Sequence, residues 1–238
     1  MSRLSLLLLA AVGVSAALLF VPLAAAEQAD AGKPVVLFNG KDLTGWKMKG
    51  NAEKSKWVVG AASLDEKAPN KLAVDKTGEQ LINASTGVDA YTEQKFGDGT
   101  IELEFMVPKG SNSGIYVMGE YEVQILDSFG KEKVGPGDLG GLYGASAPKL
   151  NASKKPGDWQ KFVIEYQAPK YEGDKKTSNM KFVKVVLNDQ VIHENVEMKG
   201  PTPSGVTGKE SATGPLMFQG DHGPVAFRNI KFTPKAAK

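Results

Sequence analysis

The sequence predicts an all-β fold in which two antiparallel sheets pack together. Apolar and acidic residues alternate strictly over residues 101–105, as a strand with one solvated face requires. Short runs of β-forming residues recur between turns rich in Gly, Pro, Asn and Asp. No longer stretch carries the apolar stripe of a helix. Many short strands without intervening helices are typical of a sandwich or a barrel.

The predicted strand segments follow one another closely along the chain. In order, they are residues 35–38, 57–59, 100–107, 114–126, 159–166, 180–187, 215–219 and 225–232. Three long connections separate some of them: residues 130–158, 168–179 and 198–214. The second connection is highly charged and is expected to form a solvated hairpin tip. Loops of this length in a β domain are usually functional or mobile.

The N-terminal segment, residues 1–26, has the three parts of a secretory signal peptide. Arg3 supplies a positive start, residues 4–23 are almost entirely apolar, and residues 24–26 are alanines that precede Glu27. An apolar run of about 20 residues could instead serve as a membrane anchor. The small residues before the polar Glu27 favour cleavage. We therefore expect export to the periplasm or the extracellular space, with no membrane contact after cleavage.

The remaining chain is expected to form a polar leader, residues 27–33, and one domain, residues 34–235. It contains no cysteine, so its stability must come from core burial rather than from disulfides. The net charge of the whole chain is +2, and no basic stripe is present, which argues against a nucleic-acid partner. Arg228 is the only arginine after the signal segment, which suggests a position that needs a planar, bidentate cation.

A dinucleotide-binding pattern, G-x-G-x-x-G, occurs at residues 135–140. This motif functions only between a strand and a helix, where the helix N-terminus meets the pyrophosphate. Here it lies inside a loop with a further Pro and Gly, and no helix follows. We interpret it as a flexible loop.

The segment 112–127 carries the clearest functional signal. If it is a regular strand, one face is apolar and consists of Ile115, Val117, Tyr121, Val123 and Ile125. The other face carries hydrogen-bonding groups and an aromatic ring: Tyr116, Met118, Glu120, Glu122 and Gln124. Asp127 would join this second face only if a bulge near Leu126 adds one residue. The alternative interpretation is a solvated strand face with no function.

The spacing Glu122-x-Gln124-x-x-Asp127 resembles the E-x-D-x-x-E strand of laminarinase- and lichenase-type glucanases. In those enzymes two carboxylates divide the roles of acid and of nucleophile or base. Gln124 replaces the central acid here, and Asp127 is one carbon shorter than glutamate. Ordinary retaining hydrolysis is therefore not the expected reaction.

His222 and Arg228 are further candidates near the C-terminus. His222 lies in a tight loop beside Asp221, which could orient the imidazole for proton transfer, although a turn residue without a role is the alternative. Arg228 is expected to share a strand face with the apolar residues Ala226, Ile230 and Phe232, so its guanidinium needs a protein carboxylate or a ligand oxygen as acceptor. The other histidine, His193, is expected to be structural.

Motifs along almost the whole chain resemble the 3-keto-disaccharide hydrolase domain family, over about residues 35–232. The matching pieces are LFNGKDLTGW at 37–46, NSGIY at 112–116, YEVQILD at 121–127, GLY at 141–143, PGDW at 156–159, ND at 188–189, GPT at 200–202, FQGDHG at 218–223 and VAFRNI at 225–230. The resemblance implies an exported bacterial protein with a concanavalin A-like β-sandwich, a jelly roll of two antiparallel sheets.

The family resemblance also implies a reaction on glycosides that are already oxidised to a ketone at C3. A base removes the acidified C2 hydrogen, an enolate forms, and the C1 substituent leaves before water adds. An arginine or a divalent metal ion would hold the enolate oxygen; no other cofactor is implied. The alternatives are a non-catalytic carbohydrate-binding domain and a conventional glycosidase.

We expect the site residues to converge on one concave pocket. Catalytic roles are expected for Glu122, Asp127 and His222, and substrate-binding roles for Tyr116, Gln124, Tyr143 and Arg228. Met118 stands where many family members carry arginine or a polar residue, so a thioether is expected to face this cleft.

Overall fold

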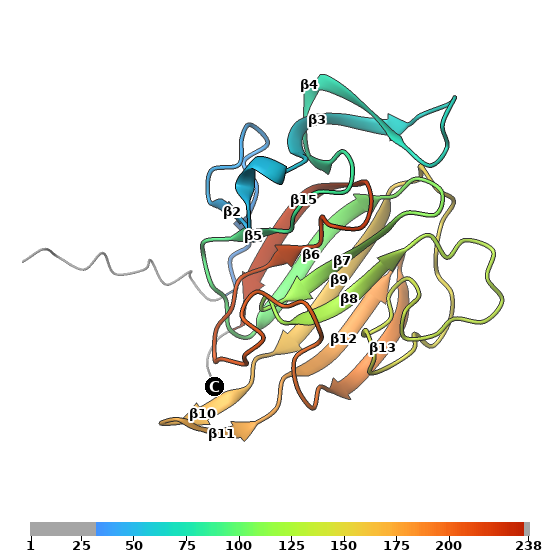
Figure 1. Ribbon diagram of the computed structural model, residues 1–238. Coiled ribbons are helices and arrows are strands. Elements are labelled where there is room, and N and C mark those ends of the chain that lie inside the picture. The colour runs from blue at the N-terminus through green and yellow to red at the C-terminus, as the bar shows by residue number, and fades with distance from the viewer. Residues whose placement is uncertain (1–31, 236–238) are drawn as a thin grey trace, which may run out of the picture.

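Two antiparallel β-sheets pack face to face in the computed structural model, which describes residues 32–235 (Figure 1). The helical structure of these residues is limited to one turn of 3-10 helix, Ala52–Lys54. The prediction of an all-β fold is therefore confirmed. The expected signal peptide, residues 1–26, and most of the leader lie outside the described residues. Within residues 32–235, no helix is long and apolar enough to cross a membrane.

The larger sheet has eight strands in the order β13-β12-β9-β6-β15-β4-β3, with β1 pairing to β15. Their bounds are β1 (Val35–Val36), β3 (Trp57–Leu64), β4 (Leu72–Asn83), β6 (Gly99–Met106), β9 (Gln160–Gln167), β12 (Lys181–Leu187), β13 (Gln190–Glu197) and β15 (Val225–Pro234). The smaller sheet has five strands in the order β2-β5-β14-β7-β8. These are β2 (Trp46–Met48), β5 (Ala90–Thr92), β7 (Asn112–Val117), β8 (Tyr121–Leu126) and β14 (Met217–Phe218). A separate hairpin, β10 (Lys170–Glu172) and β11 (Lys175–Ser178), occupies the connection where a hairpin tip was expected.

The core lies between the two sheets and is rich in stacked aromatic rings. Phe218 of the small sheet and Phe227 of the large sheet stack with centroids 3.9 Å apart. Trp46 and Trp57 extend this stack on either side. Because offset ring stacking adds to area burial, this column contributes both apolar burial and a fixed sheet-to-sheet orientation.

The segment 114–126 is a hairpin rather than one strand. Met118 and Gly119 take positive φ angles of 55° and 72° in the turn, which ends β7 and reverses the chain. The two predicted faces nevertheless survive, because Tyr116 pairs with Glu122 directly across the hairpin. The five apolar residues predicted for the core face all belong to the core.

Strand β15 contains an irregularity that changes which side chains face the core. The register shifts between Arg228 and Lys231, and Asn229 has a positive φ of 54°. Ile230 therefore returns to the core between the sheets, whereas Arg228 remains on the opposite face. The expectation that Arg228 shares a face with Ile230 and Phe232 is wrong, because the bulge reverses the alternation there.

Candidate active site

The outward face of the β7–β8 hairpin forms the floor of the candidate site. Cross-strand pairs place Tyr116 opposite Glu122, and Gly114 opposite Gln124. Since directly paired residues share a face of the sheet, these side chains point away from the core. Gly114 lacks a side chain in the middle of this polar row, which leaves room for the side chain of a neighbour.

Gly114 is required by the position of the Glu122 carboxylate. A Cβ atom at residue 114 would lie 2.3 Å from Glu122 Oε1, which is far closer than atoms approach without bonding. The carboxylate thus occupies the space that any other residue at position 114 would fill. Gly114 and Glu122 together define the bottom of the pocket.

Three loops close this floor into a pocket of about 140 Å³. Nine residues line it: Asn112, Tyr116, Glu122, Gln124, Tyr143, Pro203, Ser204, Gln219 and His222. Five of the seven residues expected to form the site are therefore brought together. Glu122, with 3 % of its surface exposed, lies at the bottom, and Tyr143, with 40 % exposed, stands at the mouth.

The electrostatic environment prepares Glu122 for proton transfer near neutral pH. Burial raises the pKa of Glu122 to about 7, despite the opposing effects of the Tyr116 hydrogen bond and the His222 charge. The negative charges of Asp221 and Asp89 raise the pKa further. A carboxyl group that titrates close to the ambient pH can both accept and return a proton.

The Tyr116 hydroxyl stands between two acceptors. Its oxygen lies 3.0 Å from Glu122 Oε2 and 3.1 Å from the Pro203 carbonyl oxygen. Burial raises the pKa of Tyr116 well above its usual range, so the hydroxyl keeps its single proton. It donates to the Glu122 carboxylate when that group is charged. When Glu122 is protonated, the hydroxyl can accept from it and donate to Pro203 instead.

His222 contributes an imidazole from the loop that follows β14. Its Nδ1 is hydrogen-bonded to Asp221, as the sequence suggested. The loop is fixed by Asn83, whose Nδ2 donates to the carbonyl oxygens of Gly220 and Gly223 at 2.9 and 3.1 Å. The imidazole is half exposed and lies on the same pocket as Glu122.

Asp89 connects the two walls of the pocket. One carboxylate oxygen accepts from Gly220 N at 2.9 Å, which holds the loop of His222. The other lies 3.3 Å from Lys49 Nζ, which also donates to the Ser204 carbonyl oxygen at 2.6 Å. A single buried carboxylate therefore ties the wall that carries His222 to the wall that carries Ser204.

Tyr143 is placed by a loop that extends the small sheet. The backbone N–H of Gln124 donates to Gly141 O, and the backbone N–H of Tyr143 donates to Glu122 O. Residues 140–143 therefore run along the open edge of β8. Behind this loop, His193 Nε2 donates to the Gly140 carbonyl oxygen at 2.8 Å, and burial lowers the pKa of the imidazole. These contacts give His193 a structural position, distant from the pocket lining.

Asp127 does not line the pocket. Pairing of β7 with β8 is regular up to Leu126, so the bulge that would have turned Asp127 toward Glu122 is absent from this hairpin. Its carboxylate instead accepts from Gly110 N at 2.9 Å and Phe129 N at 3.3 Å. These bonds stabilise the turns on either side of the hairpin, and the expected convergence of Asp127 with Glu122 is wrong.

Arg228 lies away from the pocket, on the outer face of the large sheet. Its Nε donates to Glu104 Oε2 at 2.7 Å, and its guanidinium stacks 4.1 Å from the centre of the Trp159 ring. The acceptor that the sequence required is therefore a protein carboxylate. The expected convergence of Arg228 with Glu122 is wrong, because the two side chains belong to different sheets.

Met118 and Glu120 also differ from expectation, because they belong to the turn between β7 and β8. Met118 is buried and is not among the residues of the Glu122 pocket. The Glu120 carboxylate accepts from the amides of Thr207 and Gly208 at 2.8 and 2.9 Å. Glu120 therefore holds the 198–214 loop over the sheet.

Sequence reasoning missed four residues of the pocket, namely Asn112, Pro203, Ser204 and Gln219. Asn112 had a detectable signal, because it shares the even-numbered face of β7 with Gly114 and Tyr116. Pro203 and Ser204 come from a loop, and Gln219 directly follows β14; no local pattern indicates that they meet the hairpin.

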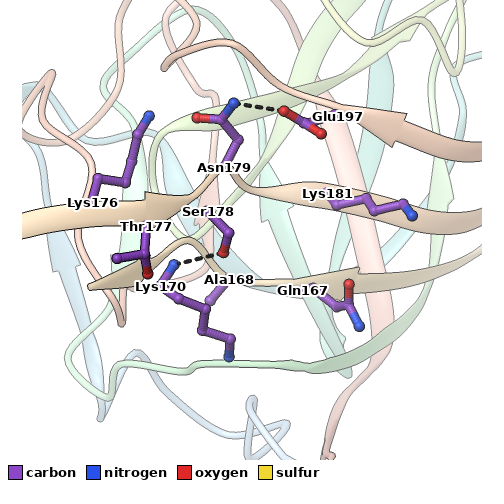
Figure 2. A pocket seen from close by; sticks show the side chains of 9 residues that line it. All are labelled: Gln167, Ala168, Lys170, Lys176, Thr177, Ser178, Asn179, Lys181 and Glu197. Carbon is purple, nitrogen blue, oxygen red and sulfur yellow. Dashed lines mark hydrogen bonds between the residues drawn. The ribbon is translucent and has the colours of Figure 1, made fainter. Parts of the chain in front are cut away.

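Another hollow, of about 530 Å³, lies beside the β10–β11 hairpin (Figure 2). Its lining contains lysines and amides but no aromatic residue. Lys170 pairs with Asp98 and Lys176 pairs with Glu210, so these cations are already neutralised by the protein. Without an aromatic stacking surface, this hollow is a weaker candidate for a sugar site.

A metal centre built from the usual ligands is not found in the described part of the chain. Within residues 32–235, no group of three or more His, Cys, Asp or Glu side chains could hold an ion together. These ligand types therefore offer no site, within the described residues, for the divalent metal that the resemblance left open.

The family model and a similar solved structure show that this is a carbohydrate-active protein. The chain belongs to the 3-keto-alpha-glucoside-1,2-lyase-like domain family, whose sequence model matches residues 33–233. No curated protein sequence matches the chain.

Solved structures support the same assignment. A candidate glycosyl hydrolase from Parabacteroides distasonis is 30% identical, with a TM-score of 0.64, over 84% of this chain and 83% of that chain. A second such protein from that organism is 20% identical, with a TM-score of 0.58, over 85% and 94% of the two chains. A third is also 20% identical, with a TM-score of 0.52, over 85% and 99%. The last two likenesses concern the fold alone.

Proposed function

We propose that this protein cleaves 3-keto-glycosides by elimination, with Glu122 as the base that removes the C2 proton. The observation that carries the proposal is the buried Glu122 carboxyl, whose pKa is raised to about 7 by burial, at the bottom of the pocket. The family, named for a 3-keto-alpha-glucoside-1,2-lyase, supplies the reaction class.

The proposed reaction proceeds in two steps. Ionised Glu122 takes the C2 hydrogen as a proton, and the C2–H electrons form an enolate with negative charge on the C3 oxygen. The enolate then collapses: the C3 ketone reforms, a C1–C2 double bond forms, and the C1–O bond breaks. The leaving oxygen takes a proton and departs as an alcohol. Addition of water across the new double bond would complete a net hydrolysis.

Side chains of the pocket supply the remaining proton donors. His222, hydrogen-bonded to Asp221, is placed to donate to the C3 oxygen or to the leaving group. Amide N–H groups of Asn112 and Gln219 are further donors on the same pocket. Preorganised donors beside a developing oxyanion are the largest source of stabilisation in such reactions. With Arg228 elsewhere, this role falls to His222 and the amides.

A conventional glycosidase mechanism has less support from the geometry. That mechanism needs two carboxyl groups on either side of the glycosidic bond. Glu122 is the only carboxylic acid among the nine residues of the pocket lining, and Asp127 is engaged in turns. A ketone beside C2 removes the need for a second carboxyl group, because it makes the C2 proton acidic.

The proposal is tested by incubation of the mature protein with methyl 3-keto-α-D-glucoside in D₂O, beside the unoxidised glucoside. We expect methanol release and deuterium incorporation at C2 from the keto sugar only. The Glu122→Gln variant should lose both activities while it still binds the sugar. Binding without turnover by the unaltered protein would favour a carbohydrate-binding domain, and turnover of the unoxidised glucoside would favour a glycosidase.

We also propose that the protein is exported, on the basis of the N-terminal segment. A carbohydrate enzyme of this kind would then meet its substrate in the periplasm or outside the cell. The segment lies outside the described residues, and N-terminal sequencing of the secreted protein tests the export.

A further inference from the structure

Unpaired amide oxygens gather in the candidate active site. In the part of the chain that the structure describes, four side-chain oxygens are fully buried without a hydrogen-bond partner in the protein. They belong to Asn83, Asn112, Gln124 and Gln219. The last three residues all line the Glu122 pocket. Buried polar atoms are nearly always paired in folded proteins, so three exceptions on one small pocket require an explanation.

The strand pairing fixes where these three amides stand. Gln124 is opposite Gly114 on one side, and the backbone N–H of Gln219 donates to Gly114 O at 2.9 Å on the other side. Asn112 lies two residues before Gly114 on the same face of β7. The three side chains therefore surround the position of Gly114, where the Glu122 carboxylate lies.

The orientation of Gln124 follows from its surroundings. Its Nε2 donates to the Gly137 carbonyl oxygen at 3.2 Å, and a carbonyl can only accept. Its Oε1 must therefore be the atom left without a partner. With 4 % of Gln124 and 7 % of Gln219 exposed, water from the bulk solvent reaches neither side chain freely.

A buried oxygen without a donor destabilises the free protein, and a ligand hydroxyl removes that cost. Three acceptors on the lining of one pocket thus match a ligand that presents several O–H groups on a single ring. A 3-keto-α-glucoside joined through C1 has three free hydroxyls on its oxidised ring, at C2, C4 and C6. The number of donors equals the number of unpaired acceptors.

We propose that the oxygens of Asn112, Gln124 and Gln219 form an acceptor triad that binds the three free hydroxyls of one terminal, unsubstituted 3-keto-hexose ring. This inference rests on the proposed function and adds a substrate requirement to it. A ring substituted at any of these hydroxyls would lose a donor and leave a buried oxygen unpaired. The protein therefore acts at chain ends and rejects rings that are linked or branched at those positions.

The test combines deoxy sugars with matched protein variants. Binding is measured by calorimetry in the Glu122→Gln background, so that the sugar is not consumed. The ligands are methyl 3-keto-α-D-glucoside and its 4-deoxy and 6-deoxy analogues, and the variants are Asn112→Leu, Gln124→Met and Gln219→Met. Gln167→Met, a substitution of the same kind at an exposed position outside the pocket, is the control.

Each pocket variant should bind the parent sugar about 10- to 100-fold more weakly, and each deoxy sugar should lose a similar factor with the unaltered triad. The decisive result is the pairing of a variant with a hydroxyl. For each deoxy sugar, one variant should bind it no more weakly than the same variant binds the parent sugar, because the partner of the missing hydroxyl is already removed. Gln219→Met should also melt no lower than its parent without ligand, because it removes an unpaired oxygen. If the loss of affinity from the variant and the loss from the deoxy sugar multiply in every combination, the triad is wrong. It is also wrong if the pocket variants bind the parent sugar normally.

The two proposals fail in different ways. If the unoxidised methyl glucoside binds with the same pattern of pairings and no keto sugar is cleaved, the triad stands and the lyase function is wrong. If methanol is released from the keto sugar but no pairing is found, the lyase function stands and the triad is wrong. If neither sugar binds, both are wrong.

Discussion

Replacement of Glu122 by Gln should stabilise the protein at alkaline pH while it abolishes turnover. The carboxyl group is buried, and burial raises its pKa from 4.5 to about 7. Protonated Glu122 contributes stability that is fully present below about pH 4.5 and is lost as the pH rises through about 7. Above that pH the folded protein holds a buried charge. A glutamine of the same shape carries no charge and still accepts from Tyr116.

The size of this effect follows from the pKa shift. A rise from 4.5 to about 7 corresponds to about 3 kcal/mol between the charged and neutral forms. The free energy of unfolding of Glu122→Gln should therefore equal that of the parent near pH 4.5. At pH 8 it should exceed that of the parent by up to about 3 kcal/mol.

Urea unfolding of both proteins at several values between pH 4.5 and pH 8 measures this difference directly. Other titrating groups, such as His193, are common to both proteins and cancel. Glu104→Gln is the control with the opposite sign, since hydrogen bonds from Asn229 and Arg228 outweigh burial and hold the pKa of Glu104 below its usual value. A difference for Glu122→Gln that does not change with pH, or a loss of stability at pH 8, would refute the electrostatic reasoning.

Four further predictions follow from the structure and the sequence. Gly114→Ala should reduce kcat by about 100-fold with little change in Tm, because its Cβ displaces the carboxylate of Glu122; an unchanged kcat would contradict this geometry. Tyr116→Phe should move the acid limb of the pH–rate profile to higher pH, because the hydroxyl lowers the pKa of Glu122; a shift of this limb to lower pH would contradict that role of the hydroxyl. Arg228→Ala should leave kcat/KM unchanged and lower the free energy of unfolding by about 1–2 kcal/mol; a loss of activity would show that Arg228 takes part in the active site. N-terminal sequencing of the secreted protein should begin at or near Glu27, whereas a membrane-bound chain that keeps Met1 would show an anchor.

Strand periodicity was sufficient to predict the central part of the site. Tyr116, Glu122 and Gln124 lie together because alternation places even-numbered residues of the hairpin on one face, and a turn of odd length preserves that parity. The turn itself was not predicted, since Met118 gives no sequence signal for a positive φ. Local patterns thus identify the face of a strand more securely than the point where the strand ends.

The errors arose where single residues alter the regular alternation. A bulge was expected near Asp127, where pairing is regular, and was not expected after Arg228, where Asn229 produces one. Bulges depend on tertiary packing as well as on the local sequence, so the alternation of residue types along a strand cannot locate them. Pro203, Ser204 and Gln219 meet the hairpin through long-range contacts, and sequence alone does not specify those distances.

The carboxylate of Asp89 has a consequence for altering substrate range. Because its two oxygens anchor the Gly220 backbone and, through Lys49, the Ser204 backbone, the two rims of the pocket are mechanically linked. Displacement of one rim would therefore strain the attachment of the other. Engineering the entrance for a bulkier sugar therefore requires a coordinated redesign of both loops, since a change in one alone transmits its strain to the other.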